Sequence, residues 1–258
     1  MTQDAQAVSF SLAGKTAVVT GSGRNIGRSI ALELARVGAR VVVNGHRDEA
    51  ALHTTVAQIA ALGGSATPVL ADISQPDEAL RLISAAKDAY GSVDVLVCNA
   101  SVRPYQPFLS ITDDDWDRVI NTNLKSAFVL ARAVVPGMVD NGWGRIIHIS
   151  GMDGFTGHTN RAHNVVCKAG LHALAKCIGQ EFGPMGITAN TVAPGWIDTE
   201  RDWNQYPNVD YAAEVKKIAV RRIGKVTDIA AACVYLASES AGYINGQVIH
   251  ANGGWHMY

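Results

Sequence analysis

The sequence predicts an α/β fold of the Rossmann type, a doubly wound parallel sheet covered by helices on both faces. Two observations carry this prediction. Strands and helices alternate over the whole 258-residue chain, and the first strand ends in a glycine-rich turn that opens a helix. A hydrophobic content of 48%, with 17% charged residues, suits one large domain better than two small ones. We therefore expect a single domain over residues 1–258, with its core at about 11–255.

In the first half of the chain, short apolar runs predict strands, and apolar residues at helical spacing predict the helices between them. The strands are expected at 16–20, 40–44, 66–70 and 93–98. The helices are expected at 25–37, 48–62 and 76–90. Pro76 opens the third of these helices, and Ser74 is its expected N-cap.

The second half of the chain continues the same alternation. Helices are expected at 113–135, from the loop 151–162 to Phe182, at 210–220 and at 228–237, and strands at 145–150, 186–192 and 247–250. Ligands of such sheets bind at the carboxyl ends of the strands. The functional residues are therefore expected in the strand-end loops, which are 20–27, 44–48, 71–73, 98–102, 150–163 and 193–200.

Charge and composition favour small-molecule chemistry in a soluble, cytoplasmic protein. The formal net charge of −1 offers no basic face for nucleic acid or a membrane surface. The N-terminus lacks the basic and apolar regions of a signal peptide, and no apolar run is long enough to span a membrane. The four cysteines show no CxxC spacing, so we expect reduced core thiols and no metal site. Cys167 adjoins Lys168, so a nucleophilic thiol is the alternative to core packing there.

The turn after the first strand predicts a dinucleotide phosphate site. Backbone N–H groups and the helix dipole at this position can hold a pyrophosphate. Gly21 permits the tight turn, and Gly27 permits close packing of the helix on the strand. Asn25 occupies the position of the middle glycine, and asparagine tolerates a left-handed conformation well. The residues expected at the phosphates are Gly21, Gly23, Arg24, Asn25, Ile26 and Gly27.

The end of the second strand predicts a preference for NADP(H) over NAD(H). NAD-binding proteins of this fold carry an acidic residue there for the ribose hydroxyls. This sequence has Asn44-Gly45-His46-Arg47 instead, with Arg24 in the facing loop. Two arginines and a histidine without a carboxylate favour a 2′-phosphate. The alternative is that Arg47 only solvates the first turn of the next helix.

With these residues in view, the chain resembles the short-chain dehydrogenase/reductase family, and its 3-oxoacyl-carrier-protein-reductase-like branch in particular. The likeness runs from about Ser11 to Trp255. It rests on Thr20-Gly21 to Gly27, Asp72, Asn99-Ala100, Asn-Thr-Asn123-Leu, Lys168-Ala-Gly, Pro194-Gly195-Trp-Ile-Asp-Thr199 and Gly246-Gln to Gly253-Gly254. The resemblance implies a cofactor site of Asp72 and Ile73 at the adenine, Asn99 and Ala100 at the adenosine ribose, Lys168 at the nicotinamide ribose, and Pro194, Gly195, Ile197 and Thr199 around the carboxamide.

The same resemblance shows where the usual catalytic residues are missing. In the family a Tyr four residues before the Lys donates the proton, and a Ser thirteen residues before the Tyr polarises the carbonyl. Counting back from Lys168 gives Asn164 and Gly151 at these positions. An amide is not a usable acid, although it can hydrogen-bond an oxygen. Asn123 and Lys168 remain and, by resemblance, hold a proton-relay water and the ribose.

A shift by one residue pairs Ser150 with His163, again thirteen apart. An imidazole is a reasonable proton donor near neutral pH. His163 lies five residues before Lys168, about 140° around a helix, so it faces elsewhere unless the helix begins after it. Other candidate donors are Asp153, His158, Tyr105 and water.

These residues predict an NADP(H)-dependent oxidoreductase with a non-standard proton donor, acting on a small carbonyl or alcohol, or on a conjugated enoyl group. The alternatives are a dinucleotide-binding protein with little catalysis, in a regulatory or subunit role, and a protein with non-redox chemistry. A substrate lid is expected at about 196–220, where Trp196, Trp203 and Tyr206 indicate an apolar pocket. By resemblance, the apolar helices at 124–135 and 165–178 pair subunits in a homotetramer.

Overall fold

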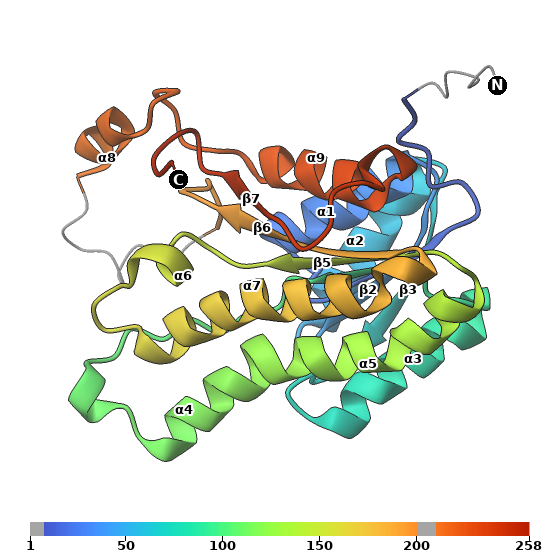
Figure 1. Cartoon of the computed structure of the whole chain (residues 1–258), viewed down its shortest axis with the longest axis horizontal. Coiled ribbons are helices and arrows are strands. Elements are labelled where there is room, and N and C mark those ends of the chain that lie inside the picture. The colour runs from blue at the N-terminus through green and yellow to red at the C-terminus, as the bar shows by residue number, and fades with distance from the viewer. Residues whose placement is uncertain (1–7, 201–209, 258) are drawn as a thin grey trace.

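The computed structural model describes residues 8–200 and 210–257. They form a seven-stranded parallel sheet in the order β3-β2-β1-β4-β5-β6-β7 (Figure 1). The strands are β1 (Thr16–Val19), β2 (Arg40–Gly45), β3 (Ser65–Leu70), β4 (Val95–Cys98), β5 (Gly144–Ile149), β6 (Ile187–Pro194) and β7 (Val248–Ala251). The strand order reverses between β1 and β4, whose carboxyl ends therefore flank the expected ligand crevice. The predicted doubly wound fold is confirmed.

Helices cover both faces of the sheet (Figure 1). One layer contains α1 (Asn25–Arg36), α2 (Glu49–Ala61) and α9 (Val226–Ala237), and the other contains α3 (Pro76–Tyr90), α5 (Ser126–Asp140) and α7 (Ala162–Phe182). Each layer has its own apolar core. Ile30, Leu52 and Ile229 belong to the first core, and Leu82, Leu130 and Leu171 belong to the second. The central strands β1 and β4 are buried along their whole length and are mainly apolar because helices cover both of their faces.

Shorter elements lie at the edges of these layers. They are α4 (Asp113–Ile120), α6 (Asp153–Thr156), α8 (Tyr211–Lys217), three 3₁₀ turns, η1 (Phe108–Ser110), η3 (Gly183–Met185) and η5 (Glu239–Ala241), and a π-helical turn, η2 (Asn121–Lys125). The short helix α6 lies within the loop that leads from β5 to α7. This loop therefore has more regular structure than the sequence indicated.

The expected helix at 113–135 is wrong in two respects. It is divided by the π turn η2, and it continues past Pro136 to Asp140. Proline removes only one backbone hydrogen bond. The following turn stays helical because buried Val134 and Met138 hold it against the core.

Four smaller expectations also need correction. Ser74 does not cap α3: Gln75 is the N-cap without a side-chain bond, and the Ser74 hydroxyl donates to Asp72 Oδ1 instead. The fourth strand begins at Val95 rather than 93. The helix expected at 228–237 begins at Val226, because Asp228 closes a capping box with the backbone of Lys225. Cys177 is exposed, whereas the other three cysteines are core thiols as expected.

Candidate cofactor and active site

The glycine-rich loop after β1 has the shape that a dinucleotide phosphate site requires. A Cβ on Gly27 would lie 2.2 Å from the Gly21 carbonyl oxygen, and one on Gly21 would lie 2.9 Å from Ala100 Cα. Neither position has room for a side chain. Asn25 has a φ of 51°, so the expected left-handed asparagine is confirmed. The loop therefore folds as tightly as the glycine spacing predicts, at the N-terminus of α1.

Asn99, at the end of β4, fixes this loop to the neighbouring strand. Its Nδ2 donates to the carbonyl oxygens of Thr20 and Gly21, over 2.9 and 3.0 Å. The Thr20 hydroxyl in turn accepts the backbone N–H groups of Asn99 and Ala100. These bonds join the carboxyl ends of β1 and β4 at the point where the strand order reverses.

Basic side chains follow the end of β2, and β2 itself contains no acidic residue. Asn44 is buried, and its amide braces the backbone of Val69 and Ala71. His46 Nε2 lies 3.3 Å from Asp72 Oδ2. Arg24 and Arg47 are exposed, and within residues 8–200 and 210–257 neither side chain forms a hydrogen bond or an ion pair. Both guanidinium groups are therefore available to a ligand.

The segment after β6 lies across the crevice from the glycine-rich loop. Asn25 Oδ1 accepts the backbone N–H of Glu200 over 2.9 Å, so the two loops touch. Gly195 packs on Asn252, where a Cβ would lie 2.7 Å from the Asn252 Cα. Ile197 is buried and pairs with Gly224 in a short parallel bridge. Thr199 is half-buried between these contacts.

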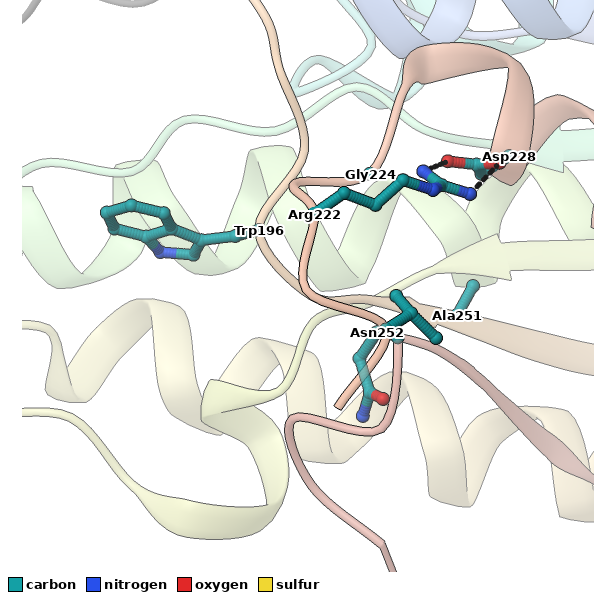
Figure 2. Close-up of a pocket in the computed structure, with 8 residues that line it drawn as sticks. Trp196, Arg222, Gly224, Asp228, Ala251 and Asn252 are labelled. Atoms are coloured by element: carbon teal, nitrogen blue, oxygen red, sulfur yellow. Dashed lines mark hydrogen bonds and ion pairs between the residues drawn. The ribbon is translucent and has the colours of Figure 1, made fainter. Parts of the chain in front are cut away.

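A pocket opens on the β7 side of this segment (Figure 2). Its wall includes Arg222, which forms a two-pronged ion pair with Asp228 over 2.6 and 3.0 Å. In the close-up, Trp196 extends away from that pair (Figure 2). Neither Lys168 nor Asn164 lines this pocket. Of the expected lid, Trp203 and Tyr206 fall outside the described residues.

Lys168 is a buried cation on α7. Its Nζ donates to the backbone oxygen of Ile149, the last residue of β5, over 3.0 Å. Burial, reinforced by the charge of Arg103, lowers the pKa of Lys168 to about 8. The ammonium is therefore held at the carboxyl edge of the sheet, where a ligand of this fold would lie.

Asn164 lies one turn before Lys168 on the same helical face, and its amide orientation follows from a chain of hydrogen bonds. The backbone N–H of Val102 donates to Asn123 Oδ1, which makes the other end of that amide the donor. Asn123 Nδ2 then donates to Asn164 Oδ1 over 3.2 Å. Asn164 Nδ2 forms no hydrogen bond with any described side chain or backbone group, so this N–H donor remains for a ligand.

The structure does not bring Ser150 and His163 together. The Ser150 hydroxyl lies 2.9 Å from His172 Nε2, beneath the Phe155 ring that stacks on His172. Helix α7 begins at Ala162, before His163, so the imidazole turns away from the Lys168 face. His163 is fully buried, and its Nδ1 accepts the backbone N–H of Asn164. Burial lowers the pKa of His163.

The remaining candidate donors lie in two loops that meet beside α7. Gln106 donates its backbone N–H to the Asn160 carbonyl over 2.7 Å, which joins the loops. The Tyr105 ring packs edge-on against His158, with both side chains exposed. Asp153 lies further in, and its Oδ2 is 3.5 Å from Arg161 Nη1.

Arg161 and His172 were not among the expected site residues. His172 lies four residues after Lys168, so helical spacing alone places it on the face that carries the two expected residues, whereas Arg161 is the N-cap of α7 and has a non-helical φ of −144°. That signal was available in the sequence. The loop contacts of Arg161 and the strand contact of His172 were not.

Two further observations limit the chemistry of the described residues. No group of three His, Cys, Asp or Glu side chains within 8–200 and 210–257 is arranged to hold a metal ion. Burial raises the pKa of the Cys167 thiol to about 11, so this group is a protonated thiol at neutral pH. None of the described helices is long and apolar enough to span a membrane.

Comparisons with known proteins agree with this geometry. A family model described as enoyl-(acyl carrier protein) reductase matches residues 21–256. The 3-oxoacyl-[acyl-carrier-protein] reductase FabG of Staphylococcus epidermidis is 39% identical over 245 residues. This match covers 94% of this chain and 99% of the relative. The chain belongs to the short-chain dehydrogenase/reductase family. The relative of Pseudomonas aeruginosa with the same name is 34% identical, over 96% of this chain and its own full length.

Solved structures of short-chain dehydrogenases share the complete fold. One from Sinorhizobium meliloti, described as a short-chain alcohol dehydrogenase, superposes with a TM-score of 0.92 at 33% identity, covering 96% of this chain and 98% of its own. One from Beutenbergia cavernae, described as an NAD(P)-dependent gluconate 5-dehydrogenase with bound NADP, has a TM-score of 0.90 at 36% identity, covering 96% and 99%. The chain is thus an oxidoreductase of this family by fold and sequence.

Proposed function

We propose that this protein is an NADP(H)-dependent oxidoreductase that interconverts a small carbonyl compound and its alcohol, or reduces a conjugated enoyl group. The observation that carries the proposal is the arrangement of Lys168 and Asn164 on one face of α7, at the sheet edge that also holds the glycine-rich loop. A bound nicotinamide would supply the hydride. The protein would orient the substrate and stabilise the negative charge that develops on its oxygen.

The cofactor residues fit a dinucleotide. We assign the phosphates to the loop from Gly21 to Gly27, the adenine to Asp72 and Ile73, and the nicotinamide ribose to Lys168. NADP(H) is favoured because Arg24 and Arg47 are exposed cations beside the end of β2, where a ribose 2′-phosphate would lie. The bound NADP of the Beutenbergia cavernae structure supports the same choice.

The proton donor is proposed to be non-standard. Asn164 Nδ2 would donate a hydrogen bond to the substrate oxygen and stabilise negative charge on it, without transferring a proton. The proton itself would come from water held near Asn123, or from Asp153 through water. Asn164 would therefore stabilise charge without supplying a proton. We expect the reaction to be slower than in an enzyme that has a Tyr at this position.

The assembly and location are also proposed from the family. Phe128 on α5 and Val166 on α7 are exposed apolar side chains on the helices expected to pair subunits. We propose a cytoplasmic homotetramer built on these helices. Light scattering after gel filtration would measure the mass, and a monomeric mass would exclude this assembly.

The proposal is tested by titrating NADPH and NADH into the purified protein and then restoring the family's residues. A Cβ added at Gly151 meets no atom within 4 Å, so Gly151→Ser fits without strain. The double variant Gly151→Ser/Asn164→Tyr should raise ketone reduction by about a hundredfold, the usual value of a general acid. Tight NADPH binding without turnover in either form would instead support a dinucleotide-binding protein with little catalysis.

A further inference from the structure

Asn25 connects the two loops that flank the proposed cofactor site. Its side-chain Oδ1 accepts the backbone N–H of Glu200 over 2.9 Å. A backbone N–H group can only donate, so the amide oxygen of Asn25, and not its nitrogen, must face Glu200. Because Asn25 begins α1 and Glu200 follows β6, the bond joins segments that are 175 residues apart in the sequence.

The shape of the phosphate loop does not require the Asn25 side chain. Asn25 has a φ of 51°, a conformation that glycine adopts without strain and that asparagine only tolerates. The glycine spacing of the loop also places Asn25 where the dinucleotide fingerprint has its middle glycine. A glycine there would form the same turn but would offer no acceptor to Glu200. The bond to Glu200 is therefore a feature that the side chain adds to the loop.

The end of the segment after β6 depends on this bond for its position. The backbone N–H of Asp198 donates to the Gly224 carbonyl oxygen over 2.7 Å, which fixes the segment up to Asp198. Within residues 8–200 and 210–257, the bond from Asn25 is the one hydrogen bond that holds Thr199 or Glu200. The placement of Thr199 opposite the phosphate loop therefore depends on the Asn25 side chain.

We propose that Asn25 is a positioning residue for the nicotinamide half of the cofactor. Its bond to Glu200 holds the end of the segment in place before the cofactor binds. The resemblance to the family assigns Thr199 to the carboxamide and the glycine-rich loop to the phosphates. A segment that is already ordered loses less conformational freedom on binding, so the bond increases the affinity for NADP(H). This inference rests on the proposed oxidoreductase function and deepens it.

The test compares the whole cofactor with its adenosine half. Asn25→Gly removes the acceptor and leaves the left-handed turn unstrained. NADPH and 2′,5′-ADP would each be titrated by calorimetry into the wild-type protein and the variant. The second ligand has the adenine, the 2′-phosphate and a 5′-phosphate but no nicotinamide. We expect Asn25→Gly to bind NADPH about three- to tenfold less tightly, the usual value of one hydrogen bond, and to bind 2′,5′-ADP as the wild type does.

Two further variants separate this role from a general effect on the loop. Asn25→Asp keeps an oxygen acceptor but adds a negative charge beside the phosphates. It should weaken both ligands and leave the ratio of their dissociation constants close to that of the wild type. A ratio that changes as much as in Asn25→Gly would refute the role of the acceptor. Asn160→Gly is the matched control, because Asn160 also has a positive φ, of 61°, and it should change neither affinity.

The outcomes distinguish the positioning role from the proposed function. Failure of the wild-type protein to bind NADPH would overturn the proposed function. NADPH binding that Asn25→Gly leaves unchanged or strengthens would overturn the positioning role alone. Equal losses of NADPH and 2′,5′-ADP affinity in Asn25→Gly would also overturn it, because they would show a distorted phosphate loop. A loss confined to NADPH would support it.

Discussion

Asn123 Nδ2 donates to Asn164 Oδ1 over 3.2 Å, and this one bond determines what Asn164 can offer a ligand. Because the backbone of Val102 fixes the orientation of the Asn123 amide, Asn164 presents an N–H donor at the position where the family resemblance expects a phenol. The π turn η2 carries Asn123 and thus holds its amide against Asn164.

This bond predicts the effect of an isosteric change. Asn164→Asp keeps an oxygen for Asn123 to donate to but replaces the free N–H donor with a second oxygen. We expect kcat/KM to fall by about a hundredfold, the usual effect of removing one donor to a developing oxyanion. Steady-state assays and thermal melts would be compared, and an Asp variant as active as the wild type would contradict the assigned role.

Gly27 provides a test of the phosphate loop. Gly27→Ala would place a Cβ 2.2 Å from the Gly21 carbonyl oxygen, so the loop must distort and NADPH binding should be lost. The matched control is Gly137→Ala in α5, where a Cβ meets no atom within 4 Å. That variant should be more stable by up to about 1 kcal/mol, with unchanged NADPH affinity. Fluorescence titration of both would decide the matter, and normal affinity in Gly27→Ala would count against this phosphate site.

Arg24 and Arg47 should determine cofactor choice. We expect the wild-type protein to bind NADPH at least about tenfold more tightly than NADH. The double variant Arg24→Ala/Arg47→Ala should lose affinity for NADPH only, because NADH has no 2′-phosphate to contact. Arg36→Ala should leave both dissociation constants unchanged. Equal dissociation constants for the two cofactors in the wild-type protein would remove the basis for the assignment.

Buried His148 predicts a loss of stability in acid. Burial lowers the pKa of His148 to about 4 from an ordinary value of 6.5, so the unfolded chain binds the extra proton first. The stability from keeping this group neutral is complete above pH 6.5 and is lost as the pH falls toward 4, by about 3 kcal/mol at most. His148→Asn should flatten a plot of Tm against pH in this range. His53→Asn, at an exposed position, should not, and an unchanged slope in His148→Asn would refute the assignment.

The fold was predictable because its signals are local. The central strand β4 is a continuous apolar run, and the residues of the glycine-rich loop lie close together in the sequence. Even the left-handed Asn25 followed from the chemistry of one residue. The π turn at Asn121–Lys125 was not predictable, because periodicity cannot distinguish a helix with one extra residue per turn from a regular one.

The site was predictable only where residues follow one another at helical spacing. Asn164 and Lys168 follow that spacing. Asn123 is distant from them in the sequence, and only the resemblance to the family predicted that it belongs to the same site. The hydrogen bond between Ser150 and His172 joins the end of a strand to the third turn of a helix, and no local sequence pattern predicts it. The contacts of Arg161 with Tyr105 and Asp153 depend equally on how two distant loops fold.

The central claim, a working NADP(H)-dependent oxidoreductase built around Lys168 and Asn164, is tested most directly by one measurement. NADPH oxidation would be followed in the presence of ketones, enones and enoyl thioesters, with the wild-type protein and with Lys168→Ala. We predict turnover of at least one substrate class by the wild-type protein and its loss in the variant. Saturating NADPH binding with no turnover of any class, or equal turnover by Lys168→Ala, would contradict the claim.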